Sequence, residues 1–179
     1  MKRYIALLRG INISGKNRIS MSELKTELAE LGFADIATYL NSGNVIFSSA
    51  TDDKHILSDK IKLMIKERFE LEIPVFIILQ EDLEELLKNA PDWWGDDNKE
   101  IYDNIIFMMP PLSYERLYDE IGSPKAEYEK VRPYKNVVFW SFSRKDYQKT
   151  NWWSKTASAK VSDKITIRTA NTVRKIVAM

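Results

Sequence analysis

The segment RYIALLRGINISGKNRIS, residues 3–20, holds the first strand, the first loop and the first helix cap of the chain. The apolar run at 3–8 predicts a buried β-strand. Ser20 and Glu23 have the spacing of a capping box, and Gly32 is a typical helix terminator, so a helix is expected between them. The first loop (residues 9–18) contains two glycines, two asparagines and three cations, and no acidic residue.

The next sixty residues extend this start to a complete supersecondary unit. Two short strands are expected at 36–40 and 44–48, on either side of a hairpin turn (residues 41–44) in which a glycine supplies positive φ. Thr51 or Asp52 is expected to cap a long helix, and the apolar run at 75–79 predicts a covered strand. The order βαββαβ is that of a ferredoxin-like unit.

The second half of the chain repeats the same order. A short acidic helix around Leu83 is followed by a loop at 92–97 and a strand at 105–109. Ser113 is expected to cap a helix, and strands at 127–131 and 137–142, a helix at 150–160, a strand at 164–168 and a helix at 172–177 follow. The sequence therefore predicts an α+β fold of two ferredoxin-like (βαββαβ) subdomains with antiparallel sheets, each followed by a short helix, with 1–90 as the first subdomain and 91–179 as the second.

Composition excludes several classes of chemistry. The 179 residues include no cysteine and a single histidine, His55, so disulfides, iron–sulfur clusters, cysteine nucleophiles and multi-histidine metal centres are not expected. No metal or cofactor is predicted. No apolar run approaches the ~18 residues of a membrane span, and the N-terminus has no signal-peptide pattern. We therefore expect a cytoplasmic protein without a membrane partner; the sequence leaves its oligomeric state open.

The expected topology brings two polar segments together. In a βαββαβ unit, the first loop and the hairpin turn lie at the same edge of the sheet. Backbone amides of glycine-rich loops, polar side chains and cations are the groups that bind anions. The predicted anion-binding residues of this edge are Arg9, Gly10, Asn12, Gly15, Lys16, Asn17, Arg18, Ser42, Gly43 and Asn44. A second interpretation is that these glycines and asparagines only satisfy turn geometry.

The first loop also approaches the pattern of a nucleotide-binding P-loop. Gly10, Gly15 and Lys16 match its spacing, but Asn17 stands where a serine or threonine would bind Mg²⁺. The helix is expected to begin several residues after the lysine, and the sheet is expected to be antiparallel. The pattern therefore does not predict a P-loop NTPase.

Several motifs together resemble the bacterial "domain of unknown function 1697" family. They are the segments 6–12, 15–17 with Met21, Thr38-Tyr39 and 42–45, and a second motif at 166–173. Thr169-Ala170 departs from the Asn-Trp of the second motif. The resemblance implies two ferredoxin-like subdomains and no assigned activity, and it suggests that both motif regions serve one surface. Arg168, Asn171 and Arg174, in and beside the second motif, complete the candidate anion site.

Charge segregation indicates the class of partner. Net charge is only +1, yet residues 1–22 contain five cations and no acid, and residues 130–179 contain twelve cations and two acids. The last third also interleaves cations with aromatic residues, as nucleic-acid surfaces do. The favoured interpretation is therefore binding of a phosphate-bearing ligand, nucleic acid or nucleotide. A basic segment that folds against the acidic segment 81–103 is the alternative origin of this pattern.

Two other functions stay open on the sequence. An enzyme acting on a small anionic metabolite would need a carboxylate, lysine or tyrosine for acid–base work, and Asp92, Asp96 and Asp97 are candidates. A non-catalytic interaction module would use exposed aromatic residues such as Trp93 and Trp94. The sequence leaves open whether the protein is an enzyme.

Overall fold

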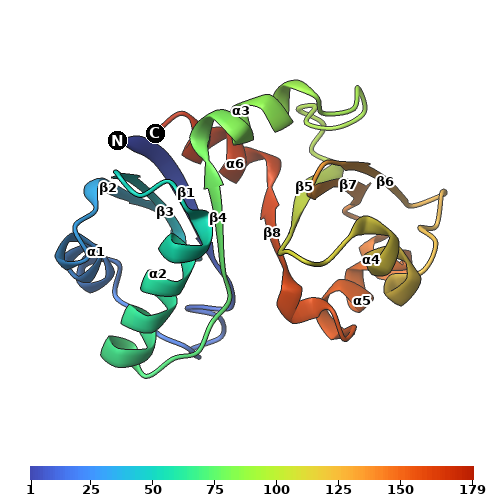
Figure 1. The fold of residues 1–179 in the computed structure, drawn as a ribbon. Helices are drawn as coiled ribbons and strands as arrows, with labels where there is room; N and C mark the ends of the chain where they lie inside the picture. The colour runs from blue at the N-terminus through green and yellow to red at the C-terminus, as the bar shows by residue number, and fades with distance from the viewer. The chain divides into compact units, whose positions relative to one another are not determined.

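The computed structural model describes residues 1–179 and contains two four-stranded antiparallel sheets (Figure 1). The first follows the order β2-β3-β1-β4 and the second the order β6-β7-β5-β8. These are ferredoxin-like arrangements, so the predicted fold class is confirmed. The elements of the first half are β1 (Lys2–Leu8), α1 (Met21–Glu30), β2 (Ala34–Tyr39), β3 (Asn44–Ser49), α2 (Lys54–Phe69), β4 (Val75–Leu79) and α3 (Gln80–Lys88).

The second half has the same element order with two short 3-10 turns added. Its elements are β5 (Ile101–Met108), α4 (Tyr114–Ile121), β6 (Glu129–Tyr134), β7 (Val137–Ser143), η1 (Tyr147–Lys149), α5 (Trp152–Ser158), η2 (Ser162–Lys164), β8 (Ile165–Thr169) and α6 (Ala170–Val177). In each half, one face of the sheet and the two helices that follow its first and third strands enclose an apolar core.

The chain forms two compact units, and its C-terminal end belongs to the first of them. Unit 1 comprises Met1–Glu85 and Lys175–Met179, and unit 2 comprises Leu86–Arg174. These ranges differ from the expected 1–90 and 91–179 mainly at the C-terminus, because the last residues bond to unit 1. Gln80 Nε2 donates to the Val177 carbonyl at 2.6 Å, and the Arg3 guanidinium donates to the Met179 carbonyl at 3.2 Å.

Helix caps in unit 1 follow local sequence rules. Ser20 caps α1 by accepting from the Glu23 amide at 3.4 Å, and Gly32 follows the helix with φ +85°, as predicted. The cap of α2 is Asp53, whose carboxylate accepts from the His55 and Ile56 amides. The expected cap at Thr51 or Asp52 was wrong by one or two residues, because an aspartate two residues before His55 reaches the first free amides.

Strand bounds in unit 2 differ from the expected ones because polar residues are paired inside the sheet. β5 begins at Ile101 rather than 105, since Asp103 and Asn104 lie opposite Ser141 and Trp140 of β7. β6 spans Glu129–Tyr134 rather than 127–131, and Pro133 is tolerated because β6 is an edge strand. α6 begins at Ala170 rather than 172, directly after β8.

A buried carboxylate organises the core of unit 2. Glu129 on β6 is 3% exposed and accepts hydrogen bonds from the Trp140 indole, from the Lys125 amide, and from the Asn151 and Trp152 amides at the start of α5. The side chains of Trp140 and Trp152 are both buried. Glu129 therefore ties β6 and β7 to α5.

The two units repeat each other in their backbone hydrogen bonds as well as in element order. The Leu8 amide donates to the Gly43 carbonyl at 2.8 Å, and the Met108 amide donates to the Asn136 carbonyl at 3.0 Å. At the other side of the central strand, the Arg9 amide bonds to Pro74 and the Met109 amide to Lys164. These matched bonds make Leu8 and Met108 equivalent, and they allow the two units to be compared position by position.

Candidate functional site

The first loop and the hairpin turn meet at one edge of the unit 1 sheet, as the topology predicts. The bond from Leu8 to the Gly43 carbonyl joins the end of β1 to the turn. A second bond runs from Asn12 Nδ2 to the Asn41 carbonyl at 2.8 Å. Two segments about thirty residues apart in the chain thus form one continuous rim.

Gly43 permits this close approach. Its φ is +92°, and a β-carbon added there would lie 2.6 Å from Leu8 Cβ and 2.9 Å from the Leu8 carbonyl oxygen. Any other residue would be strained in conformation and would collide with backbone. The turn itself covers Leu40 to Gly43, with Leu40 also at positive φ, so it is longer than a two-residue hairpin turn.

The first loop is a small hairpin in its own right. The Lys16 amide donates to the Ile13 carbonyl at 2.8 Å, with Ser14 and Gly15 both at positive φ between them. This is the geometry of a type I′ turn. The Asn12 amide donates to the Asn17 carbonyl at 3.0 Å and closes the base of the hairpin. Its tip exposes Ile13 and Lys16 to solvent.

The asparagines predicted to bind an anion form side-chain hydrogen bonds within these loops. Asn12 bonds through its side chain to both backbone groups of Ile19 as well as to Asn41. Asn17 Nδ2 donates to the Gly10 carbonyl, and Asn44 Nδ2 donates to the Tyr39 carbonyl and to Ser42 Oγ. Their amides therefore fix the shape of the rim. The second interpretation of the sequence, turn geometry, describes these side chains.

The cations of the first loop occupy two different environments. Arg9 is half-buried at the end of β1, whereas Lys16 and Arg18 are exposed and form no ion pair. Arg18 lines an open hollow of about 560 Å³, together with Asn12, Gly15, Ile19, Ser20, Met21 and Asn41. This lining contains no carboxylate, and it includes the first residue of α1, where free helix amides favour an anion. Glu23, in the first turn of α1, is the nearest acid along the chain.

The remaining predicted anion-binding residues, Arg168, Asn171 and Arg174, belong to unit 2. The Arg168 guanidinium donates to Thr166 Oγ1 and to the Ile167 carbonyl, and burial lowers the pKa of Arg168 to about 10, so it is still a cation at neutral pH. Asn171 and Arg174 lie on α6 and line a hollow of about 350 Å³. The structure thus distributes the candidate residues over two units.

The hollow of unit 2 has a mixed lining. It lies at the edge where β5 begins and β7 and β8 end, and the other lining residues are Asp96, Asp97, Asn98, Lys99, Ile101, Tyr102, Asp103, Arg144, Thr169 and Ala170. The Arg144 guanidinium lies 4.3 Å from the Tyr102 ring centroid. Arg174 donates to the Gly95 carbonyl at 2.5 Å and lies 5.9 Å from the Trp94 ring centroid. Asp96 and Asp97 were candidates for acid–base chemistry on the sequence, whereas no local signal pointed to Asp103 or Arg144.

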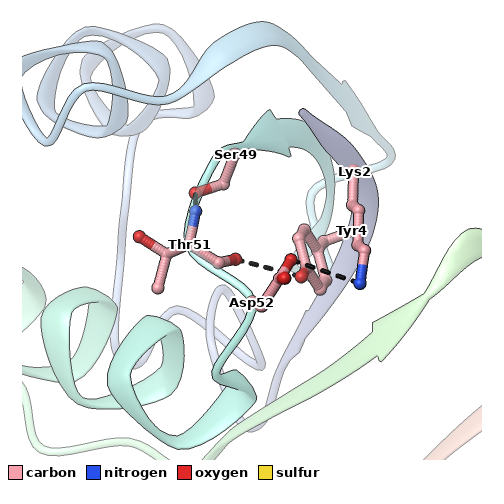
Figure 2. Close-up of polar contacts among 5 residues, drawn as sticks. All are labelled: Lys2, Tyr4, Ser49, Thr51 and Asp52. Carbon is pink, nitrogen blue, oxygen red and sulfur yellow. Dashed lines mark hydrogen bonds and ion pairs between the residues drawn. The ribbon is translucent and has the colours of Figure 1, made fainter.

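At the equivalent edge of unit 1, the cation Lys2 is paired with a carboxylate (Figure 2). Lys2 Nζ and Asp52 Oδ1 are 3.2 Å apart, and this pairing raises the pKa of Lys2. The Tyr4 hydroxyl donates to the Thr51 carbonyl at 3.0 Å, and burial raises the pKa of Tyr4. Ser49 Oγ accepts from the Thr51 amide at 3.1 Å, which holds the chain between β3 and α2 in place.

The tryptophans of unit 2 are mostly inside the fold. Trp140 and Trp152 are buried, and Trp94 is 6% exposed with its indole donating to the Asn104 carbonyl. Trp153 is exposed and Trp93 half-buried. Most of the tryptophans that the sequence offered for base stacking or for a protein interface therefore pack inside unit 2. No helix has the length and apolar character needed to cross a membrane.

These features define an α+β protein of two ferredoxin-like units with a glycine- and asparagine-built loop rim on the first. The profile of the family described as "Protein of unknown function (DUF1697)" matches residues 1–139, and the chain belongs to this family. The match includes the whole rim and ends before the motif at 166–173.

A solved structure extends the likeness to the whole chain. It is that of the conserved bacterial protein SP0830 from Streptococcus pneumoniae, with 32% sequence identity and a TM-score of 0.86. The alignment covers 99% of this chain and 97% of that one. A search of curated proteins finds no significant match.

Proposed function

We propose that the loop rim of unit 1 binds a phosphate-bearing ligand, with a nucleic-acid strand as the favoured one. The observation that carries this proposal is the hollow beside Arg18, where two converging loops and the start of α1 meet without a carboxylate in the lining. Lys16 and Arg18 supply cations that no acidic side chain neutralises. Backbone amides and unpaired cations together are typical of phosphate sites.

The length of the first loop supports a role beyond folding. The same connection from central strand to helix takes residues 109–113 in unit 2, whereas unit 1 uses residues 9–20. Both connections preserve the same backbone bonds to the neighbouring strands. Because unit 2 forms its sheet with the shorter connection, the extra residues of unit 1 are not needed for the ferredoxin-like fold. Surplus ordered loops of this kind are common carriers of binding function.

The surroundings of the cations favour a nucleotide-containing ligand over a bare anion. Ile13 at the tip of the hairpin is 58% exposed and Leu40 in the hairpin turn is 55% exposed. Apolar side chains beside cations suit a ligand with both a phosphate and a sugar or base. The hollow is also open, so it can accept a continuous strand.

The test is a titration of the full chain with a fluorescein-labelled 15-nucleotide single strand at low salt. The double variant Lys16→Gln/Arg18→Gln is expected to lose about tenfold in affinity, and removing two phosphate contacts should reduce the salt slope by roughly 1.4. Glu23→Gln, which removes the nearest carboxylate, is expected to tighten binding modestly. The matched control is Lys60→Gln/Lys62→Gln, a pair of exposed cations on α2.

Two results would reject the proposal. One is the absence of saturable binding by wild type at low salt. The other is an equal loss of affinity in the rim variant and in the α2 control, which would indicate attraction by overall charge alone. Parallel titrations with ATP and with inorganic phosphate distinguish a nucleotide or small-anion site from a strand-binding one.

A further inference from the structure

The hollow of unit 2 brings together charges of both signs that do not pair with one another. Its charged lining residues are three carboxylates, Asp96, Asp97 and Asp103, and three cations, Lys99, Arg144 and Arg174. The structure contains no ion pair among these six. The lining is therefore neutral as a whole, with its positive and negative groups held apart.

The cations are held in place by aromatic rings. Arg144 lies over the Tyr102 ring, and Arg174 is fixed by the Gly95 carbonyl beside the Trp94 ring. Neither arrangement uses a carboxylate, so each guanidinium keeps its full charge and further donors for a ligand. α6 begins at the same hollow, where Thr169 Oγ1 caps the Thr172 amide and Ala170 and Asn171 form part of the lining.

Asp103 supplies the opposite charge from within the sheet. It is 8% exposed, lies on β5 and lines the hollow. Its Oδ1 accepts from the Ser141 hydroxyl on β7, while its Oδ2 accepts no hydrogen bond from the protein. No buried side-chain oxygen of the structure lacks a hydrogen-bond partner, so Oδ2 is open to the hollow and can accept a hydrogen bond from a ligand there. The acidic residues here do not form a group that could hold a metal ion, so an organic donor fits better.

In the equivalent hollow of unit 1, the two basic side chains already have partners within the protein. It is lined by Met1, Lys2, Arg3, Leu79, Gln80, Glu81 and Glu84. By strand register, Arg3 takes the place of Asp103, and its guanidinium donates to the Asp35 carbonyl, to Ser48 Oγ and to the Met179 carbonyl. Lys2 is paired with Asp52. The protein thus uses the basic groups of that hollow itself.

We propose that the hollow of unit 2 binds a small zwitterionic molecule that carries a protonated amine and a carboxylate or phosphate. The amine bonds to Asp103 Oδ2, and the anionic group lies between Arg144, Arg174 and the start of α6. A molecule with only one charged group would meet repulsion from half of the lining, whereas a molecule with a cationic and an anionic end complements both halves. The volume of about 350 Å³ is at the small end of metabolite sites.

Calorimetric titration of the full chain tests this with matched probes. The zwitterions are β-alanine, 4-aminobutyrate and O-phosphoethanolamine, and the singly charged controls are butyrate and butylamine. At least one zwitterion is expected to bind tenfold or more tightly than both controls. The comparison of 4-aminobutyrate with O-phosphoethanolamine distinguishes a carboxylate ligand from a phosphate one.

Variants locate the binding. Asp103→Asn keeps the size and the Ser141 contact but removes the charge, and Arg144→Gln changes an exposed side chain; each is expected to weaken zwitterion binding by about tenfold or more, the effect of one charge-assisted hydrogen bond. Glu84→Gln in the unit 1 hollow and Lys145→Gln, next to Arg144 but outside the lining, are expected to have no effect.

The proposal is overturned if no zwitterion gives measurable heat at 10 mM, if the zwitterions bind no more tightly than the controls, or if the Arg144 variant binds like wild type. Should Asp103→Asn unfold, the Arg144 variant decides alone. The test is independent of the rim: Lys16→Gln/Arg18→Gln should leave zwitterion binding unchanged, and Arg144→Gln should leave rim binding of the labelled strand within twofold of wild type.

Discussion

Helices α2 and α5 hold the same place in their two units, yet their first turns are held by different means. α2 is capped by the exposed Asp53, one residue before the helix. At the start of α5, Asn151 makes no side-chain cap bond; the Asn151 and Trp152 amides bond to the buried Glu129 of β6, and the Trp153 amide bonds to Thr150 Oγ1. One unit thus uses a solvated cap from the adjacent residue, and the other adds a long-range, buried carboxylate, so the same topology does not imply the same distribution of stability.

The sheet edges near these helices carry different charges at equivalent positions. Arg3 faces Ser48 across β1 and β3, and at the equivalent pair Asp103 faces Ser141 across β5 and β7. On the helices that follow, Glu81 and Glu84 of α3 correspond to Asn171 and Arg174 of α6. The two units therefore share a backbone arrangement but place different charges at equivalent positions of this edge.

The largest loss of stability is expected when Glu129 is replaced. Glu129→Ala should destabilise unit 2 by about 4 kcal/mol, because it leaves an indole and several amides without their charged acceptor. Asp53→Ala should cost unit 1 only ~1 kcal/mol, the usual value of a cap. Urea unfolding followed by circular dichroism measures both. Equal losses in the two variants would show that the buried and exposed caps are equivalent after all.

Gly43 and Asn136 provide the next comparison, since their carbonyls accept the same bond in the two units. Gly43→Ala should destabilise unit 1 by about 3 kcal/mol, through positive φ and contact with Leu8. Asn136→Ala, at an exposed turn, should change stability by less than ~0.5 kcal/mol. Urea denaturation of the pair tests the close approach, and a Gly43→Ala protein as stable as wild type would contradict it.

Variants at Asn12 and Asn17 test how much the side-chain hydrogen bonds of the rim contribute to stability. Both residues have φ near +50°, so alanine costs the same backbone strain at each position. Asn12→Ala should nevertheless lose about 2 kcal/mol and Asn17→Ala about 1 kcal/mol, because Asn12 makes three side-chain bonds and Asn17 one. Thermal denaturation of the two variants gives the difference. A smaller loss in Asn12→Ala would mean that the rim holds together without it.

Tyr4 provides the last comparison, in which the change in stability depends on pH. At the equivalent position unit 2 has Asn104, which does not titrate in this range. Tyr4→Phe removes the bond to the Thr51 carbonyl and should cost about 1 kcal/mol at pH 7. The pKa of Tyr4 is raised in the fold, so the folded state holds this proton more tightly than the unfolded state.

This stabilisation is complete below the unfolded pKa of about 10 and is lost as pH rises through the folded pKa. Wild type should therefore lose stability more steeply than Tyr4→Phe above pH 10. Unfolding free energies at pH 8, 10 and 11 measure the difference. Parallel curves for the two proteins would contradict a raised pKa.

Local signals in the sequence were enough for the element order, the caps at Ser20 and Ser113, and the convergence of the two loops. Topology alone placed residues 41–44 beside the first loop, because strand direction is fixed by the connections. The sequence did not distinguish asparagines that bond a ligand from asparagines that bond a loop, since both uses favour the same residue type. Asn12, Asn17 and Asn44 are the examples.

Other features depend on partners far along the chain. Nothing around Glu129 indicates that its carboxylate will meet amides more than twenty residues later. The hollow beside Asp103 is assembled from three strand ends, a loop and a helix, so no short motif describes it. Expected strand bounds were wrong where a polar or proline residue is paired inside a sheet, because its burial is set by the neighbouring strand.

The return of Lys175–Met179 to unit 1 has a consequence for how the protein can be dissected. The polypeptide passes between the units twice, once within α3 and once within α6. A single protease cut at either passage leaves the two units covalently joined through the other. Separating them by genetic means requires unit 2 to be excised as an insert, with the severed ends of unit 1 rejoined.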